Sequence, residues 1–243
     1  MTILILGGTT EARELAAALV VGGLDVISSL AGRVNSPSLP AGRVRIGGFG
    51  GADGLAECLR RQQVSAVVDA THPFAATISA NAQQAANRTS TPLVRLERPG
   101  WRDHPRSGSW TWVADAAAAR AAAEAAARPF LTTGRQSLPD FRPWANREVL
   151  VRLVDQPSTP LPQRWILIMS RGPYRYSDEH QILTEHGTDV LITKDSGGAH
   201  TVPKLDAAGD LGIPVVIIAR PQRPQVPHVE TVAEAVAWCR GRR

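Results

Sequence analysis

A glycine-rich turn near the start of the chain is the first segment whose residue types suggest chemistry. Gly7-Gly8-Thr9-Thr10 follows an apolar run, Thr2–Leu6, and precedes a helical stretch, Glu11–Val21. Glycine lets the backbone approach a phosphate closely, and a helix N-terminus offers N–H groups and a positive dipole to an anion. The full G-x-G-x-x-G spacing is absent. The turn and Glu11 therefore predict a dinucleotide-phosphate site, and an ordinary strand-to-helix turn capped by threonine is the alternative.

The end of the second predicted strand, Leu24–Leu30, discriminates between dinucleotides. Domains that bind NAD usually place an acid there for the ribose 2′-hydroxyl, whereas domains that bind NADP accept an arginine. The residues that end the strand and follow it, Ser28–Arg33, include no acid. Arg33 can reach a 2′-phosphate. The pattern therefore favours NADPH over NADH as the cofactor.

A second glycine-rich loop, Gly47–Gly51, follows the short predicted strand Val44–Ile46. A loop with so many glycines can pass close to a flat ligand such as adenine, or to the pyrophosphate. Gly48, Phe49 and Gly50 are therefore candidate cofactor contacts.

The fourth predicted strand, Ala66–Ala70, runs into the segment Asp69-Ala-Thr-His-Pro-Phe-Ala75. In a doubly wound sheet this is where a nicotinamide ring and a substrate would meet. Thr71 is therefore a candidate cofactor contact, and His72 and Pro73 are candidate substrate contacts. His72 is also a candidate proton donor. A helix start, with Thr71 as cap and Pro73 in the first turn, is the bland alternative, and both can hold together.

The densest loop of the second half is Thr193–Lys204. It contains Lys194 and Lys204, the only lysines of the chain, beside Ser196 and the pair Gly197-Gly198. Backbone amides, hydroxyls and ammonium groups in such a loop suit an anion. A solvated surface loop would explain the lysines but not the two glycines, so the loop predicts anion binding.

Several other chemistries lack their residues. Short-chain dehydrogenases use a Tyr-x-x-x-Lys pair, but neither Tyr174 nor Tyr176 has a lysine three or four positions later. No serine nucleophile elbow and no metal-binding cluster stands out, so we expect no metal. Cys58 and Cys239 lie far apart in helix-like surroundings and are interpreted as buried apolar side chains.

The composition is that of a globular protein with scattered basic residues. The formal net charge is +5, and arginine supplies nearly all of the 27 basic side chains. No basic run interleaved with aromatics appears, so we expect no nucleic-acid partner. Two interpretations of the arginines stay open, namely a GC-rich genome and a basic cleft for a polyanionic small molecule. No apolar run is long enough to span a membrane and no signal peptide is evident, which predicts a cytoplasmic protein. The oligomeric state stays open.

Strand and helix signals alternate along the chain, which predicts parallel sheets covered on both faces. An alanine-rich helix is predicted over Ala114–Ala127, and Thr231–Glu234 has the form of a capping box. Pro92–Pro99 resembles Pro214–Pro221 at an offset of 122 residues, and two further segment pairs match in the same order. We therefore predict two similar Rossmann-like, doubly wound parallel-sheet domains, 1–128 for NADPH and 129–243 for the substrate, with the ligand cleft between them.

Ligands of open α/β sheets bind at the carboxyl ends of the strands. The loops after the predicted strands of the second half therefore supply the candidate substrate contacts. These are Thr133, Arg171, Tyr174, Lys194, Ser196, Gly197, Gly198 and Lys204.

Five sequence blocks lie in order over nearly the whole chain. They are Leu6–Ala12, Asp69–Ala75, Glu97–Trp101, Arg171–Tyr174, and Thr193–Gly198 with Lys204. Together they resemble the precorrin-6A reductases of cobalamin biosynthesis, with Tyr174 at a place where that family has phenylalanine. The resemblance implies NADPH-dependent reduction of precorrin-6A, an anionic tetrapyrrole, to precorrin-6B, with hydride going to C19 and a proton to the neighbouring carbon. It also implies two Rossmann-like domains with the macrocycle between them.

For such a reaction we expect positioning of the nicotinamide against the macrocycle to dominate. Solvent or the substrate's own carboxyl groups can supply the proton, so we expect no single side chain, His72 included, to be essential. Two alternatives stay open: an NADPH-dependent reductase of another polycarboxylate, and a non-catalytic dinucleotide-binding or sensing protein. The choice between a metal-free and a cobalt-containing substrate is also open.

Overall fold

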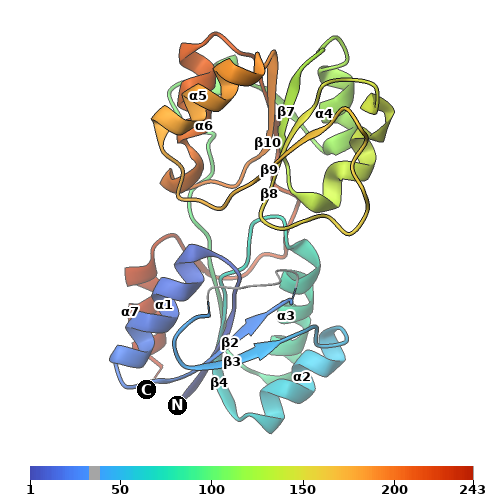
Figure 1. The fold of residues 1–243 in the computed structure, drawn as a ribbon. Coiled ribbons are helices and arrows are strands. Elements are labelled where there is room, and N and C mark those ends of the chain that lie inside the picture. Colours follow the sequence, from blue (N-terminus) through green and yellow to red (C-terminus); the bar gives the residue numbers. More distant parts are fainter. Residues whose placement is uncertain (33–38, 243) are drawn as a thin grey trace. The chain divides into compact units, whose positions relative to one another are not determined.

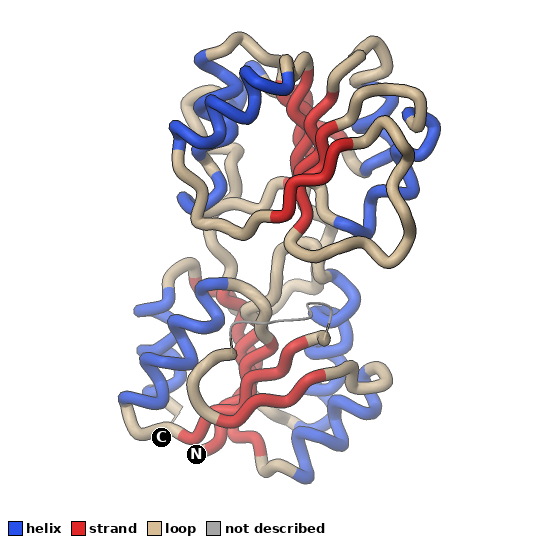
Figure 2. Tube along the Cα trace, viewed as in Figure 1, coloured by secondary structure: helices blue, strands red, loops and turns tan. Residues whose placement is uncertain are grey.

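The computed structural model describes residues 1–32 and 39–242. The chain forms two units, the first comprising Met1–Pro99 with Pro221–Arg243 and the second comprising Gly100–Arg220. Each unit is built on one six-stranded parallel sheet that has helices on both faces (Figures 1 and 2). The predicted fold class is therefore confirmed. Arg33, the predicted 2′-phosphate contact, lies outside the described residues.

The sheet of the first unit has the strand order β12-β5-β4-β1-β2-β3. Its strands are β1 (Thr2–Leu6), β2 (Asp25–Leu30), β3 (Arg43–Ile46), β4 (Val64–Asp69), β5 (Leu93–Leu96) and β12 (His228–Val229). Its helices are α1 (Thr10–Val21), α2 (Ala52–Arg61), α3 (Ala76–Thr89) and α7 (Val232–Arg240). Ile3 and Ile5 pack in the core beneath α1 and α7, whereas Leu4 and Leu6 pack beneath α2 and α3, because successive strand side chains point to opposite faces.

The sheet of the second unit has the order β6-β11-β10-β7-β8-β9. Its strands are β6 (Thr111–Val113), β7 (Pro129–Thr132), β8 (Leu150–Leu153), β9 (Ile166–Met169), β10 (Val190–Lys194) and β11 (Val215–Ile218). Its helices are α4 (Ala116–Ala122), α5 (Tyr176–His186) and α6 (Pro203–Asp210), with the 3₁₀ segments η1 (Ser107–Ser109), η2 (Arg135–Trp144) and η3 (Ala199–Thr201). Phe130 and Leu191 of the strands pack with Leu183 of α5 and Leu205 of α6 in one apolar core.

In each unit, one edge strand and the helix that follows it come from the other half of the chain. β6 and α4 follow β5 in the sequence, but β6 pairs with β11 of the second unit. In turn, β12 and α7 follow β11, but β12 pairs with β5 of the first unit. The units therefore divide at Pro99 and again at Arg220, whereas we predicted one boundary between residues 128 and 129. The sequence repeat marked equivalent strands, and this exchange of end segments moved the boundaries.

Two local predictions have different outcomes. The capping box at Thr231 is confirmed, since its hydroxyl accepts a hydrogen bond from Glu234 N and the Glu234 carboxylate accepts one from Thr231 N. The alanine-rich helix is shorter than predicted, because α4 ends at Ala122. Beyond it, Glu124 is bound by Arg147 at 2.6 Å, and Ala127 N donates to Asp189 at 2.6 Å. These specific contacts outweigh the helix propensity of alanine there.

Candidate functional site

The glycine-rich turn lies between β1 and α1, as predicted. Gly7 N donates to the carbonyl oxygen of Ser29 at 2.9 Å, which fixes the turn against β2. Gly8 has φ +116°, a conformation that favours glycine, and a Cβ built there meets no atom within 4 Å. The backbone at Gly8 is thus open to a close-approaching group, as a phosphate turn requires.

The hydroxyl of Thr9 caps the helix that follows the turn, as the alternative interpretation of this turn expected, and it also bonds to the segment after a neighbouring strand. It accepts a hydrogen bond from Ala12 N at 3.1 Å as the cap of α1 and donates to the carbonyl of Ala70 at 2.8 Å. Both bonds tie the turn to the first turn of α1 and to the end of β4. Thr10 accepts a hydrogen bond from Arg13 at 2.9 Å. The turn is therefore held rigid by its own threonines.

A narrow hollow of about 10 Å³ lies beside this turn, at the carboxyl ends of β1, β4 and β5. It is lined by Thr9, Glu11, Ala70, Thr71, Pro73, Leu96, Glu97 and Arg98. Four of these, Thr9, Glu11, Thr71 and Pro73, are predicted site residues, so the fold brings them together. Arg98 was not predicted, and its Nη1 lies 2.7 Å from the Glu11 carboxylate.

A buried carboxylate, Asp69, holds the loop that carries Thr71 and His72. Its Oδ1 accepts hydrogen bonds from the backbone N and the hydroxyl of Thr71, at 3.2 and 2.6 Å. Its Oδ2 accepts one from the Ser79 hydroxyl at 2.6 Å and one from Arg223 at 3.0 Å. The hydroxyl of Thr71 is therefore engaged in shaping the loop.

Two buried arginines balance the acids at this end of the sheet. Arg223 has a 4% exposed side chain and lies 3.4 Å from Glu97, while Arg95 lies 3.7 Å from both Asp69 and Glu97. Burial lowers the pKa of Arg95 from its ordinary value, and the charge of Arg223 acts in the same direction. Arg95 also donates to the carbonyl of Pro224 at 2.8 Å. Two cations and two carboxylates thus fix the returning segment around Arg223 to the ends of β4 and β5.

His72 is partly buried, and its ring contacts Phe74. Its Nδ1 accepts a hydrogen bond from Phe74 N at 3.2 Å, and the two rings lie 5.8 Å apart. Because Nδ1 is the acceptor, the hydrogen of the neutral imidazole lies on Nε2. His72 is therefore oriented by its own loop as a neutral imidazole that donates a hydrogen bond from Nε2.

The second glycine-rich loop connects β3 to α2. Gly48 and Gly50 are exposed and have open space where a Cβ would lie, while Phe49 is partly buried. The Cζ of Arg45 lies 3.9 Å from the centroid of the Phe49 ring. The predicted residues of this loop are thus placed at a strand end, beside an arginine that the sequence had not singled out.

In the second unit, hydrogen bonds and an ion pair hold the loop after β10 in place. Asp195 accepts a hydrogen bond from Trp101 N at 3.1 Å and lies 3.4 Å from Arg220 Nε. Trp101 Nε1 donates to the carbonyl of Gly198 at 3.4 Å. The backbone N of Ser196 donates to the carbonyl of Lys194 at 2.7 Å, so the chain turns sharply before the glycine pair. Burial lowers the pKa of the Lys194 amine.

Lys204, one of the predicted substrate contacts, is a buried lysine. It is 3% exposed, and its amine donates to the carbonyl of Thr201 at 3.1 Å and lies 5.0 Å from the Trp101 ring centroid. These contacts support the loop around Gly198. Any contact between Lys204 and a substrate stays a prediction.

Arg171 and Tyr174 follow β9 and differ in environment. Arg171 is exposed and forms no hydrogen bond or ion pair with any residue that the structure describes. Tyr174 is partly buried, and its backbone N donates to the carbonyl of His200 at 3.3 Å, which joins its loop to the one that contains Gly198. Beneath Tyr174 the guanidinium of Arg152 lies 4.4 Å from the ring centroid and pairs with the buried Glu179 at 2.9 Å.

Thr133 lies just after β7, in the place that Gly7 takes after β1. It is 2% exposed, and its hydroxyl has no hydrogen-bond partner in the part of the chain that the structure describes. Gly134 follows it with φ +78°. The position at the carboxyl end of a strand agrees with the predicted site, and the substrate contact itself stays a prediction.

Comparison with known proteins shows to which family the chain belongs. A family model described as precorrin-6x reductase CbiJ/CobK matches residues 2–240. The chain belongs to this family. A precorrin-6A reductase of Rhodococcus erythropolis is 53% identical over 240 residues, covering 97% of this chain and 96% of the relative. A cobalt-precorrin-6A reductase of Priestia megaterium is 31% identical over 235 residues, covering 90% and 91%.

A solved structure of the same family agrees with the fold. It is titled CobK precorrin-6A reductase, and it superposes with a TM-score of 0.93 and 41% identity, covering 100% of this chain and 97% of that one. The match of sequence and fold confirms the resemblance drawn from the five sequence blocks. It also confirms the expectation of a reductase of cobalamin biosynthesis with two Rossmann-like sheets.

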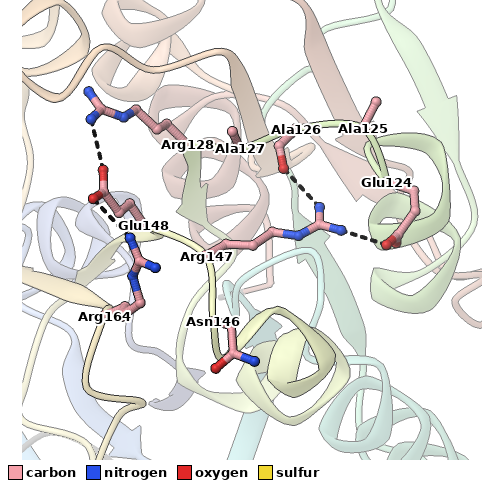
Figure 3. A pocket seen from close by; sticks show the side chains of 9 residues that line it. All are labelled: Glu124, Ala125, Ala126, Ala127, Arg128, Asn146, Arg147, Glu148 and Arg164. Atoms are coloured by element: carbon pink, nitrogen blue, oxygen red, sulfur yellow. Dashed lines mark hydrogen bonds and ion pairs between the residues drawn. The ribbon is translucent and has the colours of Figure 1, made fainter.

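A more spacious hollow, of about 540 Å³, lies elsewhere on this family member, at the amino ends of β7, β8 and β9 (Figure 3). Its charged side chains bind one another: Glu148 pairs with Arg128 at 2.9 Å and Arg164 at 3.2 Å, and Glu124 pairs with Arg147 at 2.6 Å. Ligands of open α/β sheets bind at the opposite, carboxyl ends. We therefore interpret this hollow as a surface ion-pair cluster.

Other functional classes find no support in the described residues. No group of three histidine, cysteine, aspartate or glutamate side chains there has the spacing of a metal site. No helix among them is long and apolar enough to cross a membrane. Both cysteines are buried, as interpreted, and burial raises the pKa of the Cys239 thiol to about 11.

Several residues of the site were not predicted from the sequence. Arg95 and Arg152 carried a usable signal, since each stands inside the same apolar tetrad, Leu-Val-Arg-Leu, and a buried arginine needs an acidic partner. Arg223 had no comparable signal, because it lies in a proline-rich segment far from Asp69 in the sequence. The partners of Arg45 and Arg98 likewise depend on strand register and tertiary contacts.

Proposed function

We propose that this protein catalyses the NADPH-dependent reduction of precorrin-6A to precorrin-6B, with hydride delivered to C19 and a proton to the neighbouring carbon. The observation that supports a dinucleotide most directly is the rigid turn at Gly7–Thr10, which is open at Gly8 and adjoins a hollow lined by predicted cofactor residues. Family membership supports the tetrapyrrole. Bound NADPH supplies the hydride.

The residues of the chain act mainly by positioning in this proposal. Asp69 fixes the Thr71–His72 loop through four hydrogen bonds, so the groups beside the nicotinamide keep their places during the reaction. The exposed guanidinium of Arg171 is suited to a carboxylate of the macrocycle, because arginine and carboxylate pair bidentately. Lys194 and the glycine pair after Ser196 would add an ammonium group and backbone amides to the same anionic substrate.

The substrate of this chain is proposed to be the metal-free macrocycle. The relative named for precorrin-6A is 53% identical to it, whereas the one named for cobalt-precorrin-6A is 31% identical. Turnover of both macrocycles under the same conditions tests this point. A higher kcat/KM with the cobalt form would contradict it.

One experiment separates the proposed reaction from its rivals. The protein is mixed with NADPH and precorrin-6A without oxygen, and NADPH absorbance and product mass are followed together. Loss of NADPH with a gain of two hydrogen atoms by the tetrapyrrole is the expected result. Tight NADPH binding without oxidation would instead favour a non-catalytic dinucleotide-binding protein, and turnover with other polycarboxylates only would favour a different reductase.

A further inference from the structure

Arg45 is a cationic side chain whose role is indicated neither by the sequence motifs nor by the name of the family. It lies on β3, and in the parallel ladder with β2 it stands directly opposite Ser29. The carbonyl of Ser29 also accepts the hydrogen bond from Gly7 of the glycine-rich turn. Arg45 is thus one strand away from the proposed phosphate turn, on the side where β2 ends.

The guanidinium of Arg45 is held in place by neutral groups. Its Nη1 donates to the Ser29 hydroxyl at 3.1 Å and to the carbonyl of Gly47 at 2.8 Å, and its Nη2 donates to the carbonyl of Gly48 at 3.0 Å. One face of the group stacks on Phe49 at 3.9 Å. Three of its five N–H groups are used, so two remain for a ligand.

The charge of Arg45 is uncompensated within the described part of the chain, where it forms no ion pair with a carboxylate. Arg43 offers a direct contrast, because it lies two residues earlier on the same strand and binds Asp25 at 2.5 Å. A fixed guanidinium without an acidic partner, already desolvated on one face, is poised to bind an anion.

The loop beside Arg45 leaves room for such an anion. A Cβ built at Gly47, Gly48 or Gly50 meets no atom within 4 Å. The loop is also seated firmly on α2, since a Cβ at Gly54 would lie 1.7 Å from the carbonyl oxygen of Phe49. The arginine, its stacking partner and the open glycines therefore form one preorganised surface.

We propose that Arg45 recognises the ribose 2′-phosphate of the dinucleotide and so determines the preference for NADPH over NADH. This inference rests on the proposed function, and it deepens that proposal. The position fits, because the ribose of a dinucleotide bound at such a turn lies at the end of the second strand, where NAD-binding domains use an acid instead. The end of β2, Ser28-Ser29-Leu30, carries no acid.

The test compares R45Q with R43Q by calorimetric titration with NADP⁺ and with NAD⁺. Loss of a charge-assisted contact with a phosphate should weaken NADP⁺ binding of R45Q about ten- to a hundredfold, and NAD⁺ binding should change less than about twofold. R43Q should keep both affinities, since Arg43 binds Asp25. R45K keeps the charge without the planar fork and should fall between the wild type and R45Q.

The outcomes separate this inference from the proposed function. Equal weakening of NADP⁺ and NAD⁺ in R45Q would mean that Arg45 only supports its loop, and an unchanged preference would also overturn the inference while leaving the proposed function intact. Loss of preference in R33Q but not in R45Q would assign the 2′-phosphate to Arg33 instead. Wild-type protein that binds neither dinucleotide would overturn the proposed function, and the inference with it.

Discussion

Asp69 and Asp195 lie at the carboxyl ends of corresponding strands, Asp69 as the last residue of β4 in the first unit and Asp195 directly after β10 in the second. Each is buried, and each binds an arginine of the segment that follows β11: Asp69 lies 3.0 Å from Arg223, and Asp195 lies 3.4 Å from Arg220. Asp195 also accepts a hydrogen bond from Trp101 N. At the scale of single residues, the two aspartates thus secure the loops in which the predicted site residues lie.

Replacement of Asp69 by asparagine should be strongly destabilising. It would leave Arg95 and Arg223 buried with Glu97 as their remaining acid, and breaking a buried ion pair costs about 3–5 kcal/mol. Urea unfolding followed by circular dichroism measures the loss. D25N is the matched control, since Asp25 and Arg43 form an exposed pair whose loss should cost less than about 1 kcal/mol. Equal losses of unfolding free energy in both variants would show that the buried ion pairs of Asp69 stabilise the fold no more than the exposed pair does.

His72→Ala tests the proton source. Because solvent or substrate carboxyl groups can supply the proton, we expect kcat to fall less than about tenfold, which is below the roughly hundredfold or more that a general acid contributes, with NADPH affinity unchanged. Single-turnover absorbance measurements check this. Abolished hydride transfer with both ligands still bound would make His72 the essential donor.

At the scale of elements, the loop between β3 and α2 depends on one close contact. Gly54, in the first turn of α2, lies beneath the carbonyl of Phe49, where a Cβ would come within 1.7 Å of the oxygen. The helix and the loop are therefore packed backbone to backbone. The geometry of the candidate cofactor residues Gly48, Phe49 and Gly50 follows from this packing.

Gly54→Ala should displace that loop. Alanine usually stabilises a helix by about 1 kcal/mol relative to glycine, but here the clash should reverse the sign to a loss of about 1–3 kcal/mol. We also expect weaker NADP⁺ binding in the variant. Thermal unfolding and titration calorimetry measure the two effects. Gly108→Ala, where a Cβ meets nothing within 4 Å, should change neither, and a stabilised G54A protein would refute the packing argument.

How far the sequence could predict these elements depends on whether the information was local. The turn at Gly7, the capping box at Thr231 and the parallel fold were predictable, because they follow from neighbouring residues and from repeated alternation. The capping role of Thr9 was also foreseen as the alternative interpretation, but its bond to Ala70 was not, since that bond joins two strands that are distant in the sequence. Arg45 was missed for the same reason, because its place opposite Ser29 is a matter of strand register.

At the scale of the whole molecule, the exchange of end segments determines which continuous part of the chain contains every strand and helix of its own unit. The second unit is continuous from Gly100 to Arg220, whereas the first needs both Met1–Pro99 and Pro221–Arg243. The core of the first unit includes Ala235 and Cys239 of α7, which pack with Leu15 and Leu19 of α1. The predicted boundary at residue 128 failed because it assumed that each half of the chain builds its own sheet.

Fragments of the chain test this division. A fragment of residues 100–220 should melt cooperatively, because it retains its whole sheet and core. A fragment of residues 1–99 lacks β12 and α7 and should expose the face of α1 that α7 covers, with dye binding and rapid proteolysis as the readout. The converse pattern, with 1–99 folded and 100–220 unfolded, would contradict the division into these units.

The exchanged segments also set an order of events during synthesis. A ribosome releases the chain from its N-terminus, so the strands β1 to β5 emerge first, but their sheet and its covering helix are completed only by the final residues, 221–243. The second unit is complete before that. The unit that is synthesised first is therefore completed last. The apolar surface of α1 stays exposed through most of translation, and this is when chaperones would be needed most.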